Sequence, residues 1–210
     1  MTGTGDPFAA LRDRYESWFE RYRGTYVSEL LAVRAQLPIA GLGVEIGVGT
    51  GRFAAPLGVV MGVDPSETMV RRACARGISG VIGTAEALPF RSSTFDYALV
   101  VTTICFVKDP AAMLAEARRV LHRGGRLVIA AVDRDSALGR RYLDTQADNP
   151  FYRHATFYSA AEIEALTLSA GFSDLHWVQT LPGGLEPGDR IHALAAGRGE
   201  GAFVVLRAAR

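Results

Sequence analysis

The stretch VEIGVGTGRF, residues 44–53, decides the fold. A short apolar run ends in glycines at alternate positions, Gly47, Gly49 and Gly51, and Glu45 lies two residues before the first of them. Glycine adopts backbone conformations that other residues avoid, and it lets a ligand approach the main chain without meeting a Cβ atom. The stretch therefore predicts a turn from a strand into a helix, either a tight turn that binds nothing or a loop that holds a ligand.

Short apolar runs that end in Gly or Asp alternate with helical stretches on both sides of this turn. Strands joined by helices form right-handed crossovers and a parallel sheet that is covered on both faces. The pattern predicts a doubly wound, Rossmann-like α/β fold. The predicted strands of this part are 41–47, 58–64, 77–84, 95–103 and 125–133, and the predicted helices are 51–57, 65–76 and 109–122.

The C-terminal part has a different order of helices and strands. Ser159 begins a predicted helix in capping-box style, and two strands follow at 172–181 and 201–209 with no helix between them. These two strands are expected to pair antiparallel, which makes a sheet of seven strands. Residues 8–37 are predicted to form a helix with aromatic side chains on one face. We expect one domain over 1–210, with an N-terminal helical extension at 1–40 and an insertion at 134–158.

Composition narrows the classes of function. The 210 residues are 49% hydrophobic and carry a formal net charge of +1. This charge gives no excess of basic residues that would indicate binding to a nucleic acid. The longest apolar run is too short to span a bilayer, and the first residues lack the apolar core of a secretion signal. Two cysteines supply neither a disulfide framework nor a four-thiolate metal site. A cytoplasmic protein without metal, membrane or nucleic-acid partner is the expectation.

Asp64, at the end of the second predicted strand, supports a nucleoside ligand. A carboxylate at this position can accept hydrogen bonds from both hydroxyls of a ribose, although an Asp before Pro65 is also common in turns. A dinucleotide is the alternative ligand, but its fingerprint is G-x-G-x-x-G, whereas the spacing here is G-x-G-x-G. A carboxylate at Glu45 suits a cationic ligand better than a pyrophosphate.

With these motifs the sequence resembles the class I S-adenosylmethionine-dependent methyltransferases. The resemblance rests on E-x-G-x-G-x-G, the acid that ends the second strand, GTAEALPF (83–90), FDYALVVTTICFV (95–107) and RGGRLVIAAV (123–132). It extends from about residue 41 to the end of the chain, and it is nearest to the type 11 branch that is similar to ubiquinone/menaquinone-biosynthesis enzymes. It implies that the cofactor is S-adenosylmethionine and that S-adenosylhomocysteine is the product.

The resemblance also implies a role for each residue of the cofactor site. The glycine loop would pass under the homocysteine part, the acid before it would hold the charged end, and Thr102 would face the methionine end. The acid after the second strand would take the ribose, with its two neighbours near the adenine, which a fourth segment would cover. The implied cofactor residues are Glu45, Gly47, Gly49, Gly51, Asp64, Pro65, Ser66, Ala85, Glu86 and Thr102.

Two departures from the family pattern affect the chemistry. Thr84 replaces an Asp that commonly binds the adenine amino group, so either Glu86 or a backbone carbonyl would take over that contact. Many relatives carry a histidine before the Asp-Pro that starts the next helix, and here Cys105-Phe106-Val107 stands in its place. No basic residue adjoins Cys105 in the sequence, so we expect an unreactive, buried thiol.

Two segments are predicted to build the pocket of a small-molecule methyl acceptor. In similar enzymes the N-terminal helix folds over the cofactor as a lid, so Tyr15 is a candidate for the catalytic site, although an aromatic stripe also suits core packing. The insertion carries His154, the first candidate for a general base; the alternative is an exposed loop histidine with no role. Transfer from a sulfonium requires alignment of the reacting atoms and exclusion of water, and no covalent intermediate.

The function predicted from the sequence is transfer of a methyl group from S-adenosylmethionine to an N, O, S or C nucleophile of a small molecule. A non-catalytic S-adenosylmethionine-binding protein is one alternative, because the common histidine is missing. A nicotinamide-dependent oxidoreductase is another, which the glycine spacing, Glu45 and the antiparallel tail disfavour. The assembly is expected to be a monomer or a homodimer.

Overall fold

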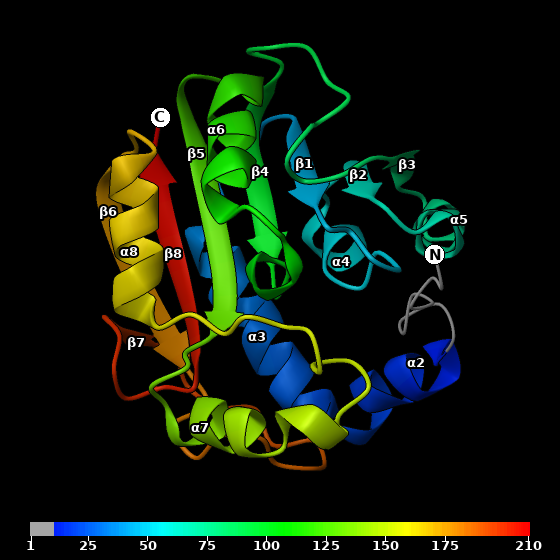
Figure 1. The fold of residues 1–210 in the computed structure, drawn as a ribbon, viewed down its shortest axis with the longest axis vertical. Helices are drawn as coiled ribbons and strands as arrows, with labels where there is room; N and C mark the ends of the chain where they lie inside the picture. The colour runs from blue at the N-terminus through cyan, green and yellow to red at the C-terminus, as the bar shows by residue number, and fades with distance from the viewer. Residues whose placement is uncertain (1–10) are drawn as a thin grey trace.

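A mixed sheet forms the centre of the computed structural model, which describes residues 11–210 (Figure 1). Its strand order is β3-β2-β1-β4-β5-β8-β6-β7; the first five strands of this order pair parallel and the last three antiparallel. The strands are β1 (Gly43–Ile46), β2 (Met61–Asp64), β3 (Ser79–Ile82), β4 (Phe95–Val101), β5 (Leu121–Val132), β6 (Ser173–Thr180), β7 (Ala195–Ala196) and β8 (Phe203–Ala209). The predicted doubly wound α/β fold is confirmed.

The C-terminal strands also pair antiparallel as predicted. β8 lies between β5 and β6 and runs antiparallel to both. The connection from β6 to β8 contains no helix that would carry the chain back across the sheet as in a parallel crossover. Seven strands are predicted, and the structure adds an eighth. This strand, β7, consists of two exposed alanines that pair with β6, and so short a segment in a glycine-rich loop carries no strand pattern.

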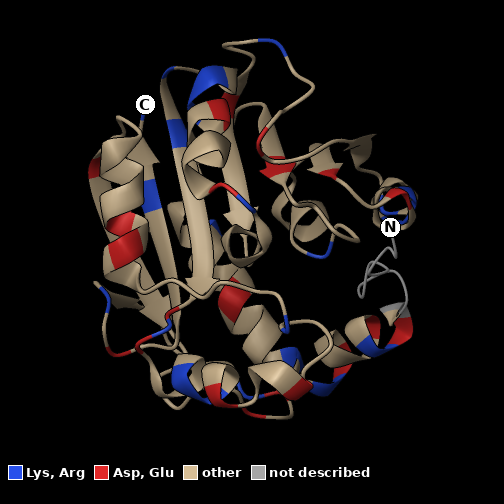
Figure 2. Cartoon of the chain, in the orientation of Figure 1, with Lys and Arg blue, Asp and Glu red and all other residues tan. Residues whose placement is uncertain are grey.

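Helices cover both faces of the sheet. α6 and α8 pack on one face, with Met113, Leu114 and Ile163 in its core, while α3 and α4 pack on the other (Figure 1). Most charged residues lie on the helices and loops, and the strands carry only a few, among them Glu45 of β1 and Asp64 of β2 (Figure 2). The helices are α2 (Arg12–Arg21), α3 (Arg23–Gln36), α4 (Ala54–Leu57), α5 (Glu67–Ala75), α6 (Pro110–Val120), α7 (Ala137–Asp144) and α8 (Ala160–Ser169), with 3₁₀ turns at Ile104–Phe106 and Gln146–Asp148.

The long helix predicted at 8–37 is divided into α2 and α3 in its described part, and residues 8–10 lie outside the described residues. Tyr22, at the junction, has non-helical dihedral angles (φ −114°, ψ 43°). The following Gly24 donates its N–H to Gly188 O at 2.7 Å, and a Cβ on Gly24 would lie 2.1 Å from Arg190 O. The loop between β6 and β7 thus lies against the start of α3, and only a glycine leaves room for it.

The carboxyl ends of the parallel strands form one edge of the sheet, and α2 and α7 lie beyond this edge (Figure 1). α2 belongs to the predicted N-terminal extension and α7 to the predicted insertion at 134–158. In a doubly wound sheet this edge holds the ligand crevice, at the point where the strand order reverses between β1 and β4. The two additions to the core fold therefore cover the edge where a ligand would bind.

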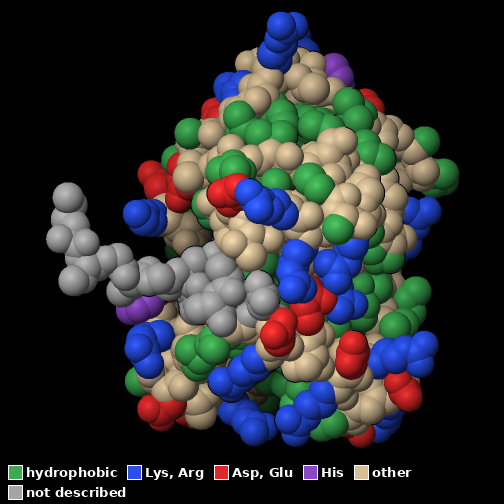
Figure 3. Space-filling model, turned by 90° about the vertical axis from the view of Figure 1, so that its right-hand side faces the viewer, with side chains coloured by type: hydrophobic (Ala, Val, Ile, Leu, Met, Phe, Trp, Pro, Cys, Tyr) green, Lys and Arg blue, Asp and Glu red, His purple; other side chains and the backbone are tan. Residues whose placement is uncertain are grey.

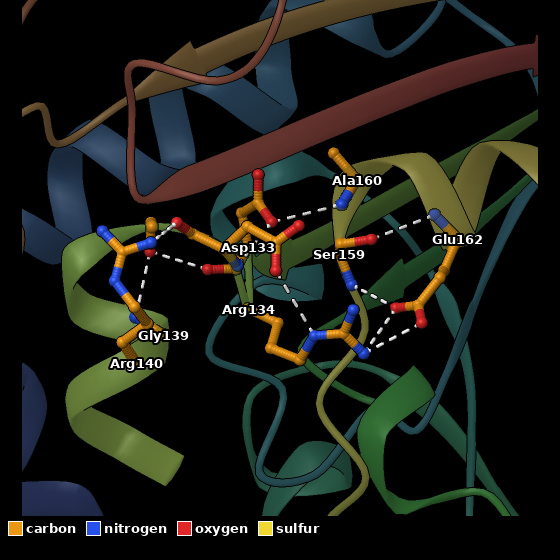
Figure 4. A network of polar contacts seen from close by, with 9 residues as sticks. Asp133, Arg134, Gly139, Arg140, Ser159, Ala160 and Glu162 are labelled. Atoms are coloured by element: carbon orange, nitrogen blue, oxygen red, sulfur yellow. Dashed lines mark hydrogen bonds and ion pairs between the residues drawn. The ribbon is translucent and has the colours of Figure 1, made fainter. Parts of the chain in front are cut away.

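Polar contacts hold the two ends of the insertion together (Figure 4). Asp133, just after β5, accepts a hydrogen bond from Ala160 N at 3.2 Å, and the Arg134 guanidinium lies 2.8 Å from a Glu162 carboxylate oxygen. Glu162 and Ser159 form the capping box predicted from the sequence, which starts α8. The insertion thus leaves and re-enters the sheet at one fixed place, so that its length lies along the edge of the cavity described next.

Candidate active site

A cavity of about 1230 Å³ opens at the carboxyl ends of β1, β2 and β4. Residues that end or follow these strands line one side, and residues of α2, α3 and the insertion line the other. Its volume exceeds the range of about 300–1,000 Å³ that is usual for a single drug-sized ligand. The cavity therefore has room for two molecules side by side.

The structure brings nearly all the predicted cofactor residues to this cavity. Two predicted residues do not line it: Gly51 of the cofactor set and His154, the candidate base, which is exposed on the surface of the insertion. The predicted residues that line the cavity are Tyr15, Glu45, Gly47, Gly49, Asp64, Pro65, Ser66, Ala85, Glu86 and Thr102.

The three glycines of the loop have different structural roles. Gly47 and Gly49 have positive φ angles (76° and 51°) and line the cavity. A Cβ on Gly47 would lie 2.3 Å from the side chain of Thr103, so the turn and this neighbour both require glycine. Gly51 also has a positive φ (79°), but its α-carbon faces α5, where a Cβ would lie 3.3 Å from the Cα of Ala73. The third glycine thus lets α5 pack closely against the turn.

Asp64 connects the glycine loop to the end of β2. Its two carboxylate oxygens accept hydrogen bonds from Gly49 N and Ser66 N, each at 2.9 Å. These contacts fix the rotamer of the side chain at the cavity wall, and they fix the shape of the loop as well. Asp64 therefore presents a carboxylate in a set orientation, which is what recognition of a ribose requires.

Glu45 places a second carboxylate in the wall of the cavity. The residue is 2% exposed, and its Oε2 atom has no hydrogen-bond partner among the described residues. Burial raises the pKa of Glu45 well above its usual value; a backbone hydrogen bond from Ala54 opposes this rise, and the charge of Asp64 adds to it. An unpaired buried carboxylate is costly, and a cationic ligand group in the cavity would remove that cost.

The segment after β3 closes another side of the cavity. Ala85 and Glu86 line it, and a Glu86 carboxylate oxygen accepts a hydrogen bond from Lys108 N at 2.9 Å. Thr84, which stands where relatives carry an Asp, forms an isolated antiparallel bridge with Ala87. The side chain of Glu86 therefore fixes this segment to the chain that follows β4.

Thr102 follows β4 in an unusual conformation. It has a left-handed φ of 48°, which is energetically costly for a β-branched residue. Such strained backbone conformations cluster at functional sites. Its N–H donates to Ala130 O at 2.8 Å, which holds the residue at the end of the sheet. Nearby, Cys105 is half-buried rather than fully buried as expected, and burial raises the pKa of its thiol to about 12, which supports the prediction of an unreactive cysteine.

Charged contacts hold α2 against the glycine loop. A Glu16 carboxylate oxygen lies 2.8 Å from Arg52 Nε and 2.8 Å from Arg76 Nη2, and Arg76 also donates to Thr50 O at 2.6 Å. Burial acts to raise the pKa of Glu16, but its hydrogen bonds and the charges of the two arginines outweigh burial and lower it. Glu16 therefore stays ionised and links the lid helix to the core.

Tyr15 lies over the glycine loop from the lid helix. Its hydroxyl lies 3.6 Å from the position that a Cβ on Gly49 would occupy, and its ring packs edge-to-face on Phe19 with centroids 5.2 Å apart. Burial, followed by the charge of Glu45, raises the pKa of the Tyr15 hydroxyl. The hydroxyl therefore keeps its proton at neutral pH and acts as a hydrogen-bonding group rather than a base. The aromatic stripe both packs and lines the cavity.

The side of the cavity away from the glycine loop is aromatic and contains one acid that sequence reasoning missed. Trp18, Tyr22, Tyr142 and Tyr152 line this side, together with Glu29 from the buried face of α3. Glu29 is 6% exposed, and burial alone raises its pKa from 4.5 to about 8. A carboxyl group that titrates near neutral pH inside a cavity is a candidate functional group.

The raised pKa of Glu29 predicts a pH-dependent stability difference between the wild type and Glu29→Gln. The unfolded chain gives up this proton near pH 4.5 and the folded protein near pH 8, so the folded state loses stability across this interval. Glutamine cannot ionise, and the variant is therefore expected to gain about 2–4 kcal/mol over the wild type at pH 9 but not at pH 4. Urea unfolding at both values measures this gain, and an equal difference at both would contradict the assignment.

Comparison with known proteins shows the family to which this chain belongs. The model of the methyltransferase domain, type 11, matches residues 44–129. A solved S-adenosylmethionine-dependent methyltransferase of Thermotoga maritima, which is described as a possible histamine N-methyltransferase, is 47% identical over 97% of this chain and 98% of its own, with a TM-score of 0.92.

Uncharacterized proteins of other organisms are also similar. One of Methanocaldococcus jannaschii is 39% identical over 96% of this chain and 97% of its own length. Another, of Mycobacterium tuberculosis, is 42% identical over 78% of this chain, which spans 60% of that longer protein. No helix within residues 11–210 is long and apolar enough to cross a membrane. The chain belongs to the S-adenosylmethionine-dependent methyltransferases.

Proposed function

We propose that this protein transfers a methyl group from S-adenosylmethionine to a nucleophilic atom of a small molecule by in-line displacement. One observation carries the proposal: a cavity of about 1230 Å³ joins the glycine loop and Asp64 to an aromatic wall that has its own acid. The first part suits a nucleoside cofactor, and the second part has room for a separate acceptor. Residues 1–210 act as one domain in this proposal, with α2 over the cofactor and the insertion, 134–158, on the acceptor side.

The residues at the glycine loop fit S-adenosylmethionine. The unpaired Oε2 of Glu45 would hold the ammonium group of the methionine part, and the fixed carboxylate of Asp64 would accept from the ribose hydroxyls. Pro65 and Ser66 would lie beside the adenine, and either Glu86 or a backbone carbonyl would contact its amino group. When bound, the cofactor supplies an electrophilic methyl group on a positively charged sulfur.

The chain itself contributes alignment and exclusion of water. Tyr15 and the rest of α2 lie over the glycine loop, and the contacts of Glu16 with Arg52 hold the helix there. Thr102, with its strained backbone, borders the region where the methyl group would lie. Holding the nucleophile in line with the methyl–sulfur bond in a dry site accounts for a large part of such catalysis. His154 has no part in this proposal, because its side chain is exposed outside the cavity.

Several features support a small molecule as the acceptor. The acceptor side is a concave, largely aromatic wall, as is usual for small-molecule sites. On the face that Figure 3 shows, acidic and basic side chains are interspersed and do not form one basic surface for a nucleic acid. The relative of Thermotoga maritima is described as a possible histamine N-methyltransferase, which supports nitrogen as the acceptor atom. The proposal also includes a cytoplasmic location for the protein and a monomeric or homodimeric assembly.

Formation of S-adenosylhomocysteine tests the proposed activity. The wild type would be incubated with S-adenosylmethionine and a panel of small amines, phenols and thiols that includes histamine, with mass spectrometry of both products. We expect a methylated product and S-adenosylhomocysteine in equal amounts with at least one member. A folded protein that binds S-adenosylhomocysteine and methylates nothing in the panel would favour the alternative function, a non-catalytic cofactor-binding protein.

A further inference from the structure

Glu29 lines the cavity but takes part in none of the proposed contacts with the cofactor. It comes from the middle of α3, on the same helical face as Tyr26 and Val33, which lie three and four residues away. The cofactor residues Glu45 and Asp64 follow or belong to strands at the other side of the same cavity. A buried carboxyl group in the middle of a helix costs stability, so its position requires an explanation.

Aromatic side chains from different segments line the cavity together with Glu29, among them Tyr142 and Tyr152. Burial raises the pKa values of both tyrosine hydroxyls, and the charge of Glu29 adds to this rise. The rings of Tyr142 and Tyr152 have centroids 5.0 Å apart, and those of Trp18 and Tyr22 are 5.4 Å apart. The acid therefore shares one cavity with aromatic rings that α2, the junction before α3 and the insertion supply.

The carboxyl group of Glu29 makes no hydrogen bond or ion pair with any residue of the described part, 11–210. Arg14 and Arg21 line the cavity from α2, but both are exposed. Burial is the one cause that shifts the pKa of Glu29, so neither arginine compensates its charge. A buried, uncompensated acid beside electron-rich rings is complementary to a cation, because ring faces attract cations and a carboxylate pairs with them.

We propose that Glu29 binds the amino group of the methyl acceptor and accepts its proton, which makes the substrate a small amine with an apolar or aromatic body. This inference rests on the proposed function and deepens it. Tyr142 and Tyr152 provide ring faces for the ammonium group and for the body of the amine, and their hydroxyls remain protonated because burial raises their pKa values.

The step balances without a further reactant. The ammonium nitrogen transfers one proton to the Glu29 carboxylate, which leaves a neutral amine with a lone pair and a neutral carboxyl group. The lone pair then forms the new carbon–nitrogen bond as the carbon–sulfur bond breaks, and its electrons stay on sulfur, which becomes a neutral thioether. The product is a methylated ammonium ion, and Glu29 keeps the proton that it accepted. The carboxyl group is thereby back in its neutral form, and the one proton released in each turnover is the one that leaves when the next ammonium ion binds.

The burial of Glu29 suits this role. A carboxyl group with a pKa of about 8 is close enough to an amine in basicity to exchange a proton with it at neutral pH. Binding an ammonium ion would ionise the group and release its proton to the solvent. The uptake of an amine below pH 8 is therefore coupled to proton release, whereas the uptake of an alcohol of the same shape is not.

Calorimetry on the protein saturated with S-adenosylhomocysteine tests this inference. Histamine, 2-phenylethylamine and tryptamine would be titrated at pH 6.5, each beside the alcohol that replaces its amino group, in two buffers of different ionisation enthalpy. We expect at least one amine to bind tenfold or more tightly than its alcohol, with net proton release. In Glu29→Gln the amine should bind at least tenfold more weakly and without proton release, while the affinity for S-adenosylhomocysteine stays unchanged.

Glu20→Gln is the matched control, because Glu20 is an exposed acid of α2 that does not line the cavity. It is expected to bind the amine and release the proton as the wild type does. Three outcomes would overturn the assignment: no amine binding, equal binding of amine and alcohol, or undiminished amine binding in Glu29→Gln. Failure of the wild type to bind S-adenosylhomocysteine would instead overturn the proposed function, so the two failures are distinguishable.

Discussion

Replacing Asp64 by alanine is expected to weaken the binding of S-adenosylhomocysteine by about 10- to 100-fold. The change removes the charged acceptor for the ribose hydroxyls. It also removes the hydrogen bonds from Gly49 N and Ser66 N, which set the shape of the glycine loop. Because the contact with the ligand and the fixed loop are lost together, we expect an effect at the upper end of this range. Titration calorimetry measures it.

Asp96→Ala is the matched control for this variant. Asp96 also accepts a backbone hydrogen bond, from Leu42 N at 2.7 Å, but it lies outside the cavity. Both variants are expected to lose some stability, since Asp64→Ala frees two backbone N–H groups and Asp96→Ala frees one. The affinity for S-adenosylhomocysteine should fall in Asp64→Ala alone. Wild-type affinity in a folded Asp64→Ala protein would remove Asp64 from the cofactor site.

Replacing Gly47 by alanine is expected to destabilise the protein by about 2–5 kcal/mol and to abolish measurable cofactor binding. The φ of 76° is unfavourable for alanine, and the added Cβ would lie 2.3 Å from the Cγ2 and Oγ1 atoms of Thr103. Thr103 follows the strained Thr102 at the end of β4, so the displacement would spread into the wall of the cavity. Urea unfolding and calorimetry report the two effects.

Gly58→Ala separates the cost of the backbone from the cost of the clash. Gly58 has nearly the same φ (75°) at the end of α4, but a Cβ there would meet nothing within 4 Å. Alanine at this position is expected to cost about 1 kcal/mol through the left-handed backbone alone, and to leave cofactor binding intact. Equal losses in the two variants would show that Thr103 moves aside freely, and would contradict the close packing assigned to Gly47.

The cofactor side could be predicted from the sequence because its signals are local. The glycines and Asp64 owe their positions to strand ends, and the ends of neighbouring parallel strands meet at one edge of the sheet. The capping box of Ser159 and Glu162 is likewise specified within four residues. Gly51 shows the limit of such local signals. The family resemblance implies that it contacts the cofactor, whereas in the structure it lies beside Ala73 of α5, a neighbour that only tertiary packing brings there.

The acceptor side could not be predicted, because it is assembled from segments far apart in the chain. His154 was the natural candidate for a base by residue type, but the turn that carries it directs the side chain to solvent. Glu29 was overlooked although a signal existed: it lies at helical spacing from Tyr22, Tyr26 and Val33, so the pattern places an acid on an otherwise apolar face. At the break between α2 and α3, the distant Gly188 donates its N–H to Arg21 O and accepts from Gly24 N, and no local sequence pattern contains these contacts.

Binding of S-adenosylhomocysteine to the wild type, with NAD as the control ligand, tests the central claim most directly. Calorimetry is expected to show a single site for S-adenosylhomocysteine and no heat of binding for NAD. At a ligand concentration of about a hundred times the dissociation constant, the fold should gain about 2.7 kcal/mol, which a thermal shift reports independently. If the folded protein binds neither ligand, or NAD alone, the glycine loop and Asp64 do not form the cofactor site described here.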